Sequence, residues 1–412
     1  MRHIPNSKKL SLVLFFASVA SLVLLPGCGG SRSTHTAPGS GSAQSKTFVY
    51  VTTLVESLGL SGTTYTGSGG ISEFQMASDG TLTKAPGSPL SFGSNTPTTL
   101  SADPLGRFLF GASANSIFTF SITPSSGELA QVVSTTLPPA PSADFAGGAM
   151  AVDHAGNFLY ALTLNGLNVY SIGASGALTS VQTITTAVDL PSGGLALDSA
   201  GKYLYAVSVG NTNIGVISPT VFSVDSTSGK VTKVSSFPAY QFGTGGLAVN
   251  PNGNFVYVLT ASPVANLVFA NTGGTITQVQ DTGCGCDSDN EGRFVLMHPS
   301  GKFLYETISN EVIGMTINSD GTLGAAISPF LGFPLTASPG INVAIALDPG
   351  GNFLFASQSL LTGPNFTLTT PVITEFAVDA ATGNLKQNPG SPFMLDVASS
   401  DPFATVAVSV PQ

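Results

Sequence analysis

One ten-residue phrase recurs along this chain of 412 residues and constrains its fold more than any other feature. Each copy holds a short turn with a glycine, followed by an aromatic, an aliphatic and a second aromatic residue. The complete copies lie at 101–110, 151–160, 196–205, 248–257, 296–305 and 346–355, and the second half alone lies at 46–50. The last aromatic residues of successive copies are 45 to 60 positions apart. A period of this length indicates an array of structural units.

Each repeat predicts four strands. In the third complete copy, Gly194–Leu197 is a short run of small and aliphatic residues, and Tyr203–Val207 alternates as a strand does after the intervening turn. Val221–Val224 predicts a third strand, and the turn Asp225–Gly229 leads to a more variable fourth strand at Lys230–Val234. Glycine supplies the positive φ that such turns need, and aspartate supplies a side-chain acceptor. We expect the aromatic residues of the second strand to fill the space between neighbouring sheets.

Seven such units predict an all-β fold, a seven-bladed β-propeller of four-stranded blades. The array begins with a second strand at Phe48–Val51 and ends with a first strand alone at Phe403–Ser409. The C-terminal strand should therefore join the N-terminal blade, close the ring and hide strand edges that would otherwise promote aggregation. A parallel β-helix or a β-sandwich also fits the strand content, but neither explains half-repeats at both ends.

Residues 1–27 predict a lipoprotein signal peptide. Three cationic residues precede the apolar run Leu10–Leu25, which is too short to span a bilayer comfortably as a helix. The run ends at Leu-Pro-Gly-Cys-Gly, which resembles the bacterial lipobox, so we expect Cys28 to be the site of lipid attachment. The alternative is an ordinary signal peptide that has a cysteine near its cleavage site.

Residues 28–45 predict a flexible tether, because they are rich in Gly, Ser and Thr. The propeller domain should then occupy residues 46–412. Gly29 after the cysteine, in place of aspartate, favours the outer membrane, so we expect a protein of the cell envelope that is anchored through its lipid and faces the periplasm or the surface.

Composition excludes several classes of protein. Gly (48 residues) and Pro (27 residues) separate short β-rich runs, which excludes an all-helical fold. Charged residues make up 8% of the chain, and the net charge of -9 includes no basic stripe, so a nucleic-acid partner is not expected. Zero Trp argues against WD40 propellers and against propellers that stack a quinone cofactor on tryptophans.

The recurring phrase, followed by a strand and Gly-x-Leu-Thr as at 80–83 and 176–179, resembles the lactonase family of seven-bladed propellers. These are relatives of 6-phosphogluconolactonase and of YVTN-repeat proteins. The resemblance extends over nearly the whole domain, from about residue 46 to residue 410, and its motifs consist of turn and packing residues. It implies the architecture strongly and an activity on lactones or sugar phosphates only weakly, with Arg, His and Glu in a central pocket.

The connections that enter first strands and join second to third strands form the face of a propeller that usually binds ligands, here called the loop face. They hold little catalytic chemistry. His154, His298 and Arg107 fall in or beside the turns between first and second strands, on the opposite, turn face. This leaves Arg293 as the one arginine expected on the loop face, whereas a phosphosugar would require more cationic donors. Long insertions at 54–69 and 360–371 are candidates to roof one side of a pocket.

The segment that enters the sixth blade, residues 281–293, is the main candidate site. Asp287, Asp289 and Glu291 alternate as the oxygen ligands of a calcium loop do, although His298 at the twelfth position excludes an EF-hand. Three interpretations remain open: a weakly supported Ca²⁺ site, a loop in which these acids and Arg293 contact a ligand, and a solvated loop without function.

The remaining cysteines, Cys284 and Cys286, lie in the same segment. As thiolates they are able to bind a metal, but in an oxidising envelope a small disulfide between them is the favoured alternative.

Two classes of function remain. We favour a propeller that acts as a ligand-binding or protein-interaction scaffold. Its expected partner is a small carbohydrate-like ligand or an envelope protein, and it is expected to be a monomer without a cofactor. The alternative is a hydrolase of sugar lactones, which requires a base or a metal to activate water and a donor for the oxyanion. No Ser-His-Asp arrangement is expected, because neither histidine of the domain lies on the loop face.

Overall fold

The computed structural model describes the chain from residue 45 onward, with gaps. The described residues are 45–55, 57–59, 62–64, 69–92, 95–113, 115–137, 149–163, 166–185, 194–209, 216–236, 240–241, 246–260, 265–282, 292–308, 311–332, 343–359, 361–362, 367–368, 371–395 and 400–412. They belong to one compact unit, Ala43–Gln412. The predicted signal peptide, Cys28 and almost all of the tether lie outside these residues. Within the described part, no helix is long and apolar enough to cross a membrane.

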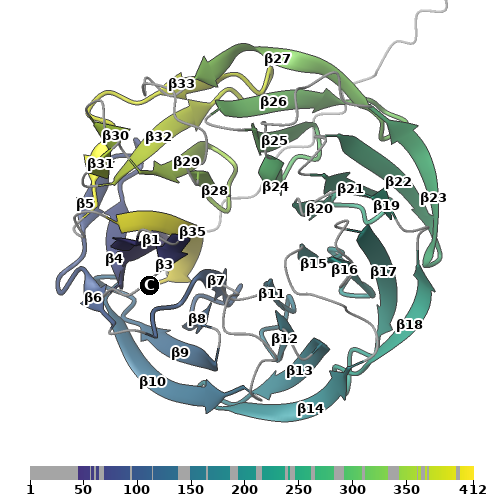
Figure 1. Cartoon of the computed structure of the whole chain (residues 1–412), viewed down its shortest axis with the longest axis horizontal. Helices are drawn as coiled ribbons and strands as arrows, with labels where there is room; N and C mark the ends of the chain where they lie inside the picture. The colour runs from purple at the N-terminus through teal and green to yellow at the C-terminus, as the bar shows by residue number, and fades with distance from the viewer. Residues whose placement is uncertain are drawn as a thin grey trace, which may run out of the picture. The chain divides into compact units, whose positions relative to one another are not determined.

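Seven antiparallel sheets of four main strands form a ring around a central axis (Figure 1). The first strands are β7 (Thr99–Ala102), β11 (Met150–Val152), β15 (Leu195–Leu197), β20 (Leu247–Val249), β24 (Gly292–Met297), β28 (Val343–Leu347) and β35 (Ser400–Pro411). The second strands are β1 (Ser45–Val55), β8 (Phe108–Ala112), β12 (Phe158–Thr163), β16 (Tyr203–Val209), β21 (Phe255–Leu259), β25 (Phe303–Ile308) and β29 (Phe353–Gln358).

The outer half of each blade consists of third and fourth strands. The third strands are β4 (Gly70–Met76), β9 (Ser116–Ile122), β13 (Gly166–Ile172), β17 (Val216–Val224), β22 (Asn266–Thr272), β26 (Glu311–Ile317) and β32 (Val372–Val378). The fourth strands are β5 (Leu82–Lys84), β10 (Leu129–Thr136), β14 (Leu178–Ile184), β18 (Val231–Ser236), β23 (Thr275–Asp281), β27 (Leu323–Gly332) and β33 (Leu385–Gln387). Three short strands also pair with third strands: β6 (Leu90–Ser91), β19 (Tyr240–Gln241) and β34 (Phe393–Met394).

Blade 1 contains both ends of the propeller, and blades 2 to 7 follow in chain order. The strand order of blade 1 is β35, β1, β4, β5, so the last strand of the chain is the first strand of this blade. β35 pairs with β1 along its length, from Ser45 opposite Pro411 to Val55 opposite Ser400, with one irregularity at Thr52. The predicted fold and the predicted closure by the C-terminal strand are therefore both confirmed.

The aromatic residues of the recurring phrase contact the next blade in the ring. In blade 6 the ring of Phe303 lies against Gly383 of blade 7, and the hydroxyl of Tyr305 donates to the Gly383 carbonyl at 2.7 Å. We call the boundary between two neighbouring blades a seam. Equivalent contacts of a ring with a glycine occur at all seven seams: Phe48 with Gly127, Phe108 with Gly176, Phe158 with Gly229, Tyr203 with Gly274, Phe255 with Gly321, Phe303 with Gly383 and Phe353 with Gly80. These glycines have positive φ and leave no room for a Cβ, which explains why the phrase and the glycine turns share one period.

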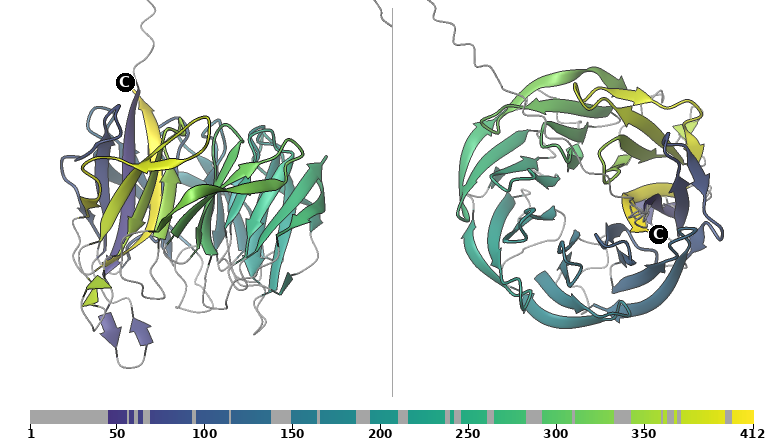
Figure 2. Two further views of the ribbon diagram at one scale, coloured as in Figure 1. Left: turned by 90° about the horizontal axis from the view of Figure 1, so that it is seen from above. Right: turned by 180° about the vertical axis from the view of Figure 1, so that it is seen from behind.

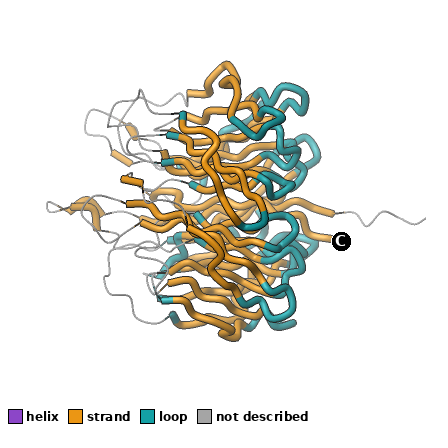
Figure 3. The backbone as a smooth tube through the Cα atoms, turned by 90° about the vertical axis from the view of Figure 1, so that its right-hand side faces the viewer, coloured by secondary structure: helices purple, strands orange, loops and turns teal. Residues whose placement is uncertain are grey.

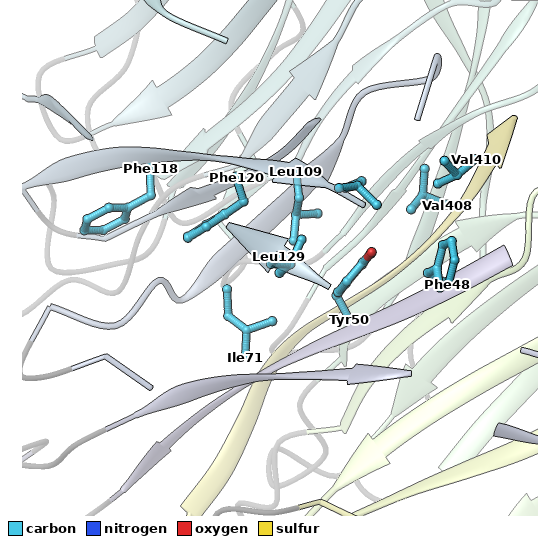
Figure 4. Packing of buried hydrophobic residues seen from close by; sticks show 10 residues of the cluster. Phe48, Tyr50, Ile71, Leu109, Phe118, Phe120, Leu129, Val408 and Val410 are labelled. Atoms are coloured by element: carbon cyan, nitrogen blue, oxygen red, sulfur yellow. The ribbon is translucent and has the colours of Figure 1, made fainter. Parts of the chain in front are cut away.

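Each seam holds its own hydrophobic cluster. Between blades 1 and 2, Phe48 and Tyr50 of β1 and Val408 and Val410 of β35 meet Leu109 of β8 (Figure 4). Near the axis the first strands approach one another closely: a Cβ added to Gly246 would lie only 2.6 Å from the backbone nitrogen of Val295 in the next blade. Bulky side chains therefore fill the space between sheets and small residues line the inner strands, as the sequence predicts.

The turn face holds the histidines and Arg107. Figure 3 shows the described turns, in teal, gathered on the face where the C-terminus lies. The rings of the two histidines and the Arg107 guanidinium bridge consecutive blades: Arg107 Nη2 donates to Gly156 O at 2.6 Å, His154 Nε2 lies 3.0 Å from Asp198 O, and His298 Nε2 lies 2.8 Å from Gly351 O. These side chains connect turns of neighbouring blades, and their predicted place on the turn face is confirmed.

Two small hairpins occur in the long insertions at the ends of the array. They are β2 (Ser57–Gly59) with β3 (Gly62–Thr64), and β30 (Leu361–Thr362) with β31 (Thr367–Leu368). Figure 2 shows both hairpins on the loop face, away from the C-terminus.

Candidate functional site

The segment that the sequence singles out lies almost entirely outside the described residues. This applies to Asp287, Asp289, Glu291 and both cysteines of the segment, Cys284 and Cys286. Arg293 is the second residue of β24, and its side chain is not described.

Glu306 is a buried carboxylic acid near the loop end of β25. It directly follows the last aromatic of the recurring phrase, Tyr305, and is 3% exposed. The residue at this place in the other six blades is small or aliphatic: Val51, Gly111, Ala161, Ala206, Val258 or Ala356. Sequence reasoning missed Glu306, although the signal was present, because one carboxylate interrupts an otherwise apolar position of the repeat.

Asn266 holds Glu306 across the seam between blades 5 and 6. The Asn266 side-chain amide donates from Nδ2 to Glu306 Oε2 at 2.8 Å. Burial raises the pKa of Glu306 from 4.5 to about 7, and the hydrogen bond from Asn266 lowers it by a smaller amount. The side-chain oxygen of Asn266 is buried and has no hydrogen bond among the described residues. A carboxyl that is close to half ionised near pH 7 is suited to general acid or base chemistry.

Both ends of the acidic segment lie near this pair. Thr282, the last described residue before the segment, donates its N–H to Asn266 O at 3.1 Å and accepts the Asn266 N–H at Oγ1 at 2.9 Å. Gly292, the first described residue after it, pairs with Ile308 of β25, two positions from Glu306. The segment 283–291 thus leaves and re-enters the described fold beside the Glu306–Asn266 pair.

Buried hydroxyl and amide groups lie at the loop ends of the other blades. They include Thr52, Thr53, Ser113, Ser116, Thr163, Asn168, Thr260, Ser357, Gln358 and Ser359. Asn168 serves the local turn, because its amide donates to Thr163 Oγ1 at 2.9 Å and its oxygen accepts from Thr183 at 3.0 Å. Among the residues the structure describes, no group of three or more His, Cys, Asp or Glu side chains is arranged to hold a metal ion.

With the exception of Arg293, the cationic residues of the domain lie away from the loop face. The chain has 13 Lys and Arg residues, of which four precede residue 46. Of the other nine, eight lie in or beside turn-face turns or on outer strands: Lys46, Lys84, Arg107, Lys202, Lys230, Lys233, Lys302 and Lys386. Arg293 is the remaining one, and β24 begins at the loop face. The loop-face connections themselves contain no Lys, Arg or His in their sequence between residues 46 and 412.

One family model matches part of the chain, and it describes the same propellers that the recurring phrase resembles. The family model described as "Lactonase, 7-bladed beta-propeller" matches residues 113–244. No curated protein matches the chain significantly by sequence.

Several solved structures share the fold. A protein of Bacteroides uniformis provisionally named 6-phosphogluconolactonase has a TM-score of 0.64 and 16% identity, over 89% of this chain and 100% of that one. A similarly named protein of Bacteroides fragilis has a TM-score of 0.62 and 17% identity, over 90% and 100%. The periplasmic gluconolactonase of Pseudomonas aeruginosa has a TM-score of 0.62 and 18% identity, over 88% and 100%. The chain is therefore a seven-bladed β-propeller, and residues 113–244 match the sequence model of the lactonase propellers.

Proposed function

We propose that this protein hydrolyses uncharged sugar lactones at its loop face, with Glu306 as the general base. The observation that carries the proposal is a buried carboxyl whose pKa is raised to about 7, held by Asn266 at the edge of the loop face. The hydrolases named among its structural relatives act on lactones, which makes ester hydrolysis the reaction to test first.

In this proposal each residue has one role. The ionised Glu306 takes a proton from a water molecule as that water attacks the lactone carbonyl carbon, and the ring C–O bond then breaks to give the hydroxy acid. The Asn266 amide fixes one carboxylate oxygen, which leaves the other to accept the proton. Because Glu306 must be ionised to act as a base, the rate should rise as the pH increases through about 7.

Charge favours an uncharged substrate over a phosphorylated one. A phosphate ester requires several cationic donors, and Arg293 is the single cation whose place in the chain brings it to the loop face. Asp287, Asp289 and Glu291 in the neighbouring segment add negative charge, which would repel an anionic substrate. Gluconolactone fits this environment better than its 6-phosphate.

A ligand-binding role without catalysis is the second candidate. It is favoured by the buried amides and hydroxyls at the loop ends, which suit hydrogen bonds to sugar hydroxyls. In either role we propose that Cys28 carries the lipid that anchors the protein in the cell envelope, at the outer membrane, as a monomer.

The test measures acid release from glucono-lactone and from its 6-phosphate by pH-stat, with the spontaneous rate in buffer subtracted. Glu306→Gln keeps the size and the contact with Asn266 but removes the base, so kcat should fall by about 100-fold or more. Glu311→Gln, on the next strand, is the matched control and should leave the rate unchanged.

A second variant separates Glu306 from the acidic segment. Asp287→Asn with Asp289→Asn, assayed with and without Ca²⁺, should retain at least half of the activity if Glu306 is the base. Full activity of Glu306→Gln, or a rate that depends on Ca²⁺ and on the two aspartates, would assign the chemistry to the segment. Absence of turnover by the wild-type protein on either lactone would leave the binding role.

A further inference from the structure

Two buried glutamates occupy equivalent positions in blades 1 and 7. Glu73 of β4 lies opposite Tyr50, and Glu375 of β32 lies opposite Phe355, in each case across from the last aromatic of the recurring phrase. The two glutamates are 1% and 0% exposed. In the other blades this position holds Thr119, Val169, Val221, Val268 or Gly314. A carboxyl at this place therefore distinguishes the closing blade and the blade before it.

The two glutamates share a local structure that interrupts the fourth strand. β5 and β33 are only three residues long, and each is followed by Pro-Gly-Ser-Pro, at 86–89 and 389–392. In each case the serine hydroxyl of this motif accepts a backbone hydrogen bond that a longer fourth strand would otherwise accept. The Glu73 N–H donates to Ser88 Oγ at 3.0 Å, and the Glu375 N–H donates to Ser391 Oγ at 2.8 Å.

Both side chains reach toward the next blade. Glu73 Oε2 accepts the N–H of Leu129, the first residue of β10 in blade 2, at 3.2 Å. Glu375 Oε1 accepts from the side-chain amide of Asn388, which also donates to Asp79 O in blade 1 at 2.9 Å. The other oxygen, Glu375 Oε2, is buried without a hydrogen bond among the described residues. Blade 1 is thus flanked by a buried carboxyl at each of its two seams.

Two other seams make a contact like that of Glu73 with Leu129, but with a carboxamide in place of the carboxyl. Gln182 of blade 3 donates to Val231 O at 3.0 Å and accepts the Val231 N–H at 2.8 Å. Gln280 of blade 5 binds Leu323 in the same way, at 3.1 and 2.6 Å. Val231 and Leu323 begin the fourth strands of their blades, as Leu129 does. A protonated carboxyl has the donor and acceptor of a carboxamide, whereas a carboxylate only accepts and is costly to bury.

The surroundings of both glutamates disfavour the carboxylate. The pKa of Glu73 is raised to about 7, mainly by burial; the hydrogen bond from the Leu129 N–H lowers it, and the charge of Glu128 makes a smaller contribution that raises it. Burial raises the pKa of Glu375 to about 7, with a smaller increase from Asp79 and an opposing effect of Asn388. Tyr50 of β1 lies opposite Glu73, and the pKa of Tyr50 is raised by burial and by the charge of Glu73.

We propose that Glu73 and Glu375 stabilise the two seams of blade 1 when they are protonated and destabilise these seams when they ionise. Blade 1 contains β1, through which the chain enters the ring, and β35, which closes it. Glu73 and Glu375 therefore act at the blade in which the ring closes. This role does not depend on the proposed activity of Glu306, which lies at a different seam.

The test follows urea unfolding of the intact protein at pH 4.5 and pH 8.5. The folded state binds these protons more tightly than the unfolded state, so the contribution is complete below pH 4.5 and is lost as the pH rises through about 7. Glu73→Gln with Glu375→Gln should raise the urea midpoint at pH 8.5 and leave it nearly unchanged at pH 4.5. Hydrogen exchange of residues 129–136 should accelerate with pH in the wild type beyond the intrinsic chemical rate, and this excess should disappear in Glu73→Gln.

A reciprocal variant provides the matched control. Gln182→Glu places a carboxyl at a seam that uses an amide, and it should lower the urea midpoint at pH 8.5 more than at pH 4.5. Equal effects of the glutamine variants at both pH values would mean that they act through packing, and the proposal would be wrong. An unchanged midpoint at pH 8.5 with unchanged exchange at residues 129–136 would also overturn it. Should the double variant not fold, each single variant and Gln182→Glu decide the question in the same way.

Discussion

Replacing a seam glycine with alanine tests the interlock that joins the blades. Gly383 has a φ of +74°, and a Cβ there would lie 2.6 Å from Phe303 Cδ1 and 2.7 Å from Ile327 Cδ1. Phe303 is buried, so its ring has little freedom to move away. Gly201 is the matched control, because its φ is +64° and nothing lies within 4 Å of the Cβ position. Both variants have the same left-handed backbone, and only Gly383→Ala collides with the neighbouring blade.

The magnitude follows from two contributions. Left-handed strain costs an alanine about 1–2 kcal/mol, and the lower entropy of the unfolded chain offsets about 0.4–1 kcal/mol of this in both variants. Overpacking adds about 1–3 kcal/mol at Gly383 alone. The free energy of unfolding should therefore fall little for Gly201→Ala, and by about 1–3 kcal/mol more for Gly383→Ala.

Urea unfolding monitored by far-ultraviolet circular dichroism and tyrosine fluorescence measures this difference, since the protein has no Trp and nine Tyr. Both variants must show the slope of the wild type, so that a shifted midpoint reports stability alone. Equal losses for Gly383→Ala and Gly201→Ala would refute the interlock, because backbone strain would then account for the whole effect.

Two further predictions concern the ends of the chain. Cys28→Ser should release the protein from membranes into the soluble periplasmic fraction, and a variant that stays with the membrane after a salt wash would exclude a lipid anchor at Cys28. Deletion of Asp401–Gln412 removes most of β35 and exposes β1 along its length, so the protein should aggregate or lose cooperative unfolding. A sharp thermal transition at the wild-type temperature, measured by circular dichroism, would argue against the need for a closed ring.

Much of the fold was predictable because it repeats. The aromatic triplet at Phe303–Tyr305 and the turn glycine Gly383 are needed once at every seam, so they recur with the period of the blades. The half-repeats at the two ends then required that the last strand pair with β1. The turn roles of His154 and His298 were predictable for the same reason, since both occupy a turn position of the phrase.

The candidate site was less accessible from the sequence, because its residues do not form a local motif. The acidic residues close together at 281–293 indicate a candidate site in the sequence, whereas Glu306 is a single carboxylate in an ordinary strand. The contact that matters joins Asn266 and Glu306, which are 40 positions apart and lie in different blades. A pattern search within one repeat does not detect such a pair.

The sequence by itself determined the number of blades, the turn chemistry and the mode of ring closure, since these depend on periodic, local requirements for small, aromatic and turn-forming residues. Only the tertiary structure decided which polar groups became buried and what they met. Glu73, Glu306 and Glu375 each stand alone in the sequence, and their raised pKa values arise mainly from burial in a seam between two sheets. Burial of this kind depends on strand register and on the neighbouring blade, neither of which is encoded next to the glutamate.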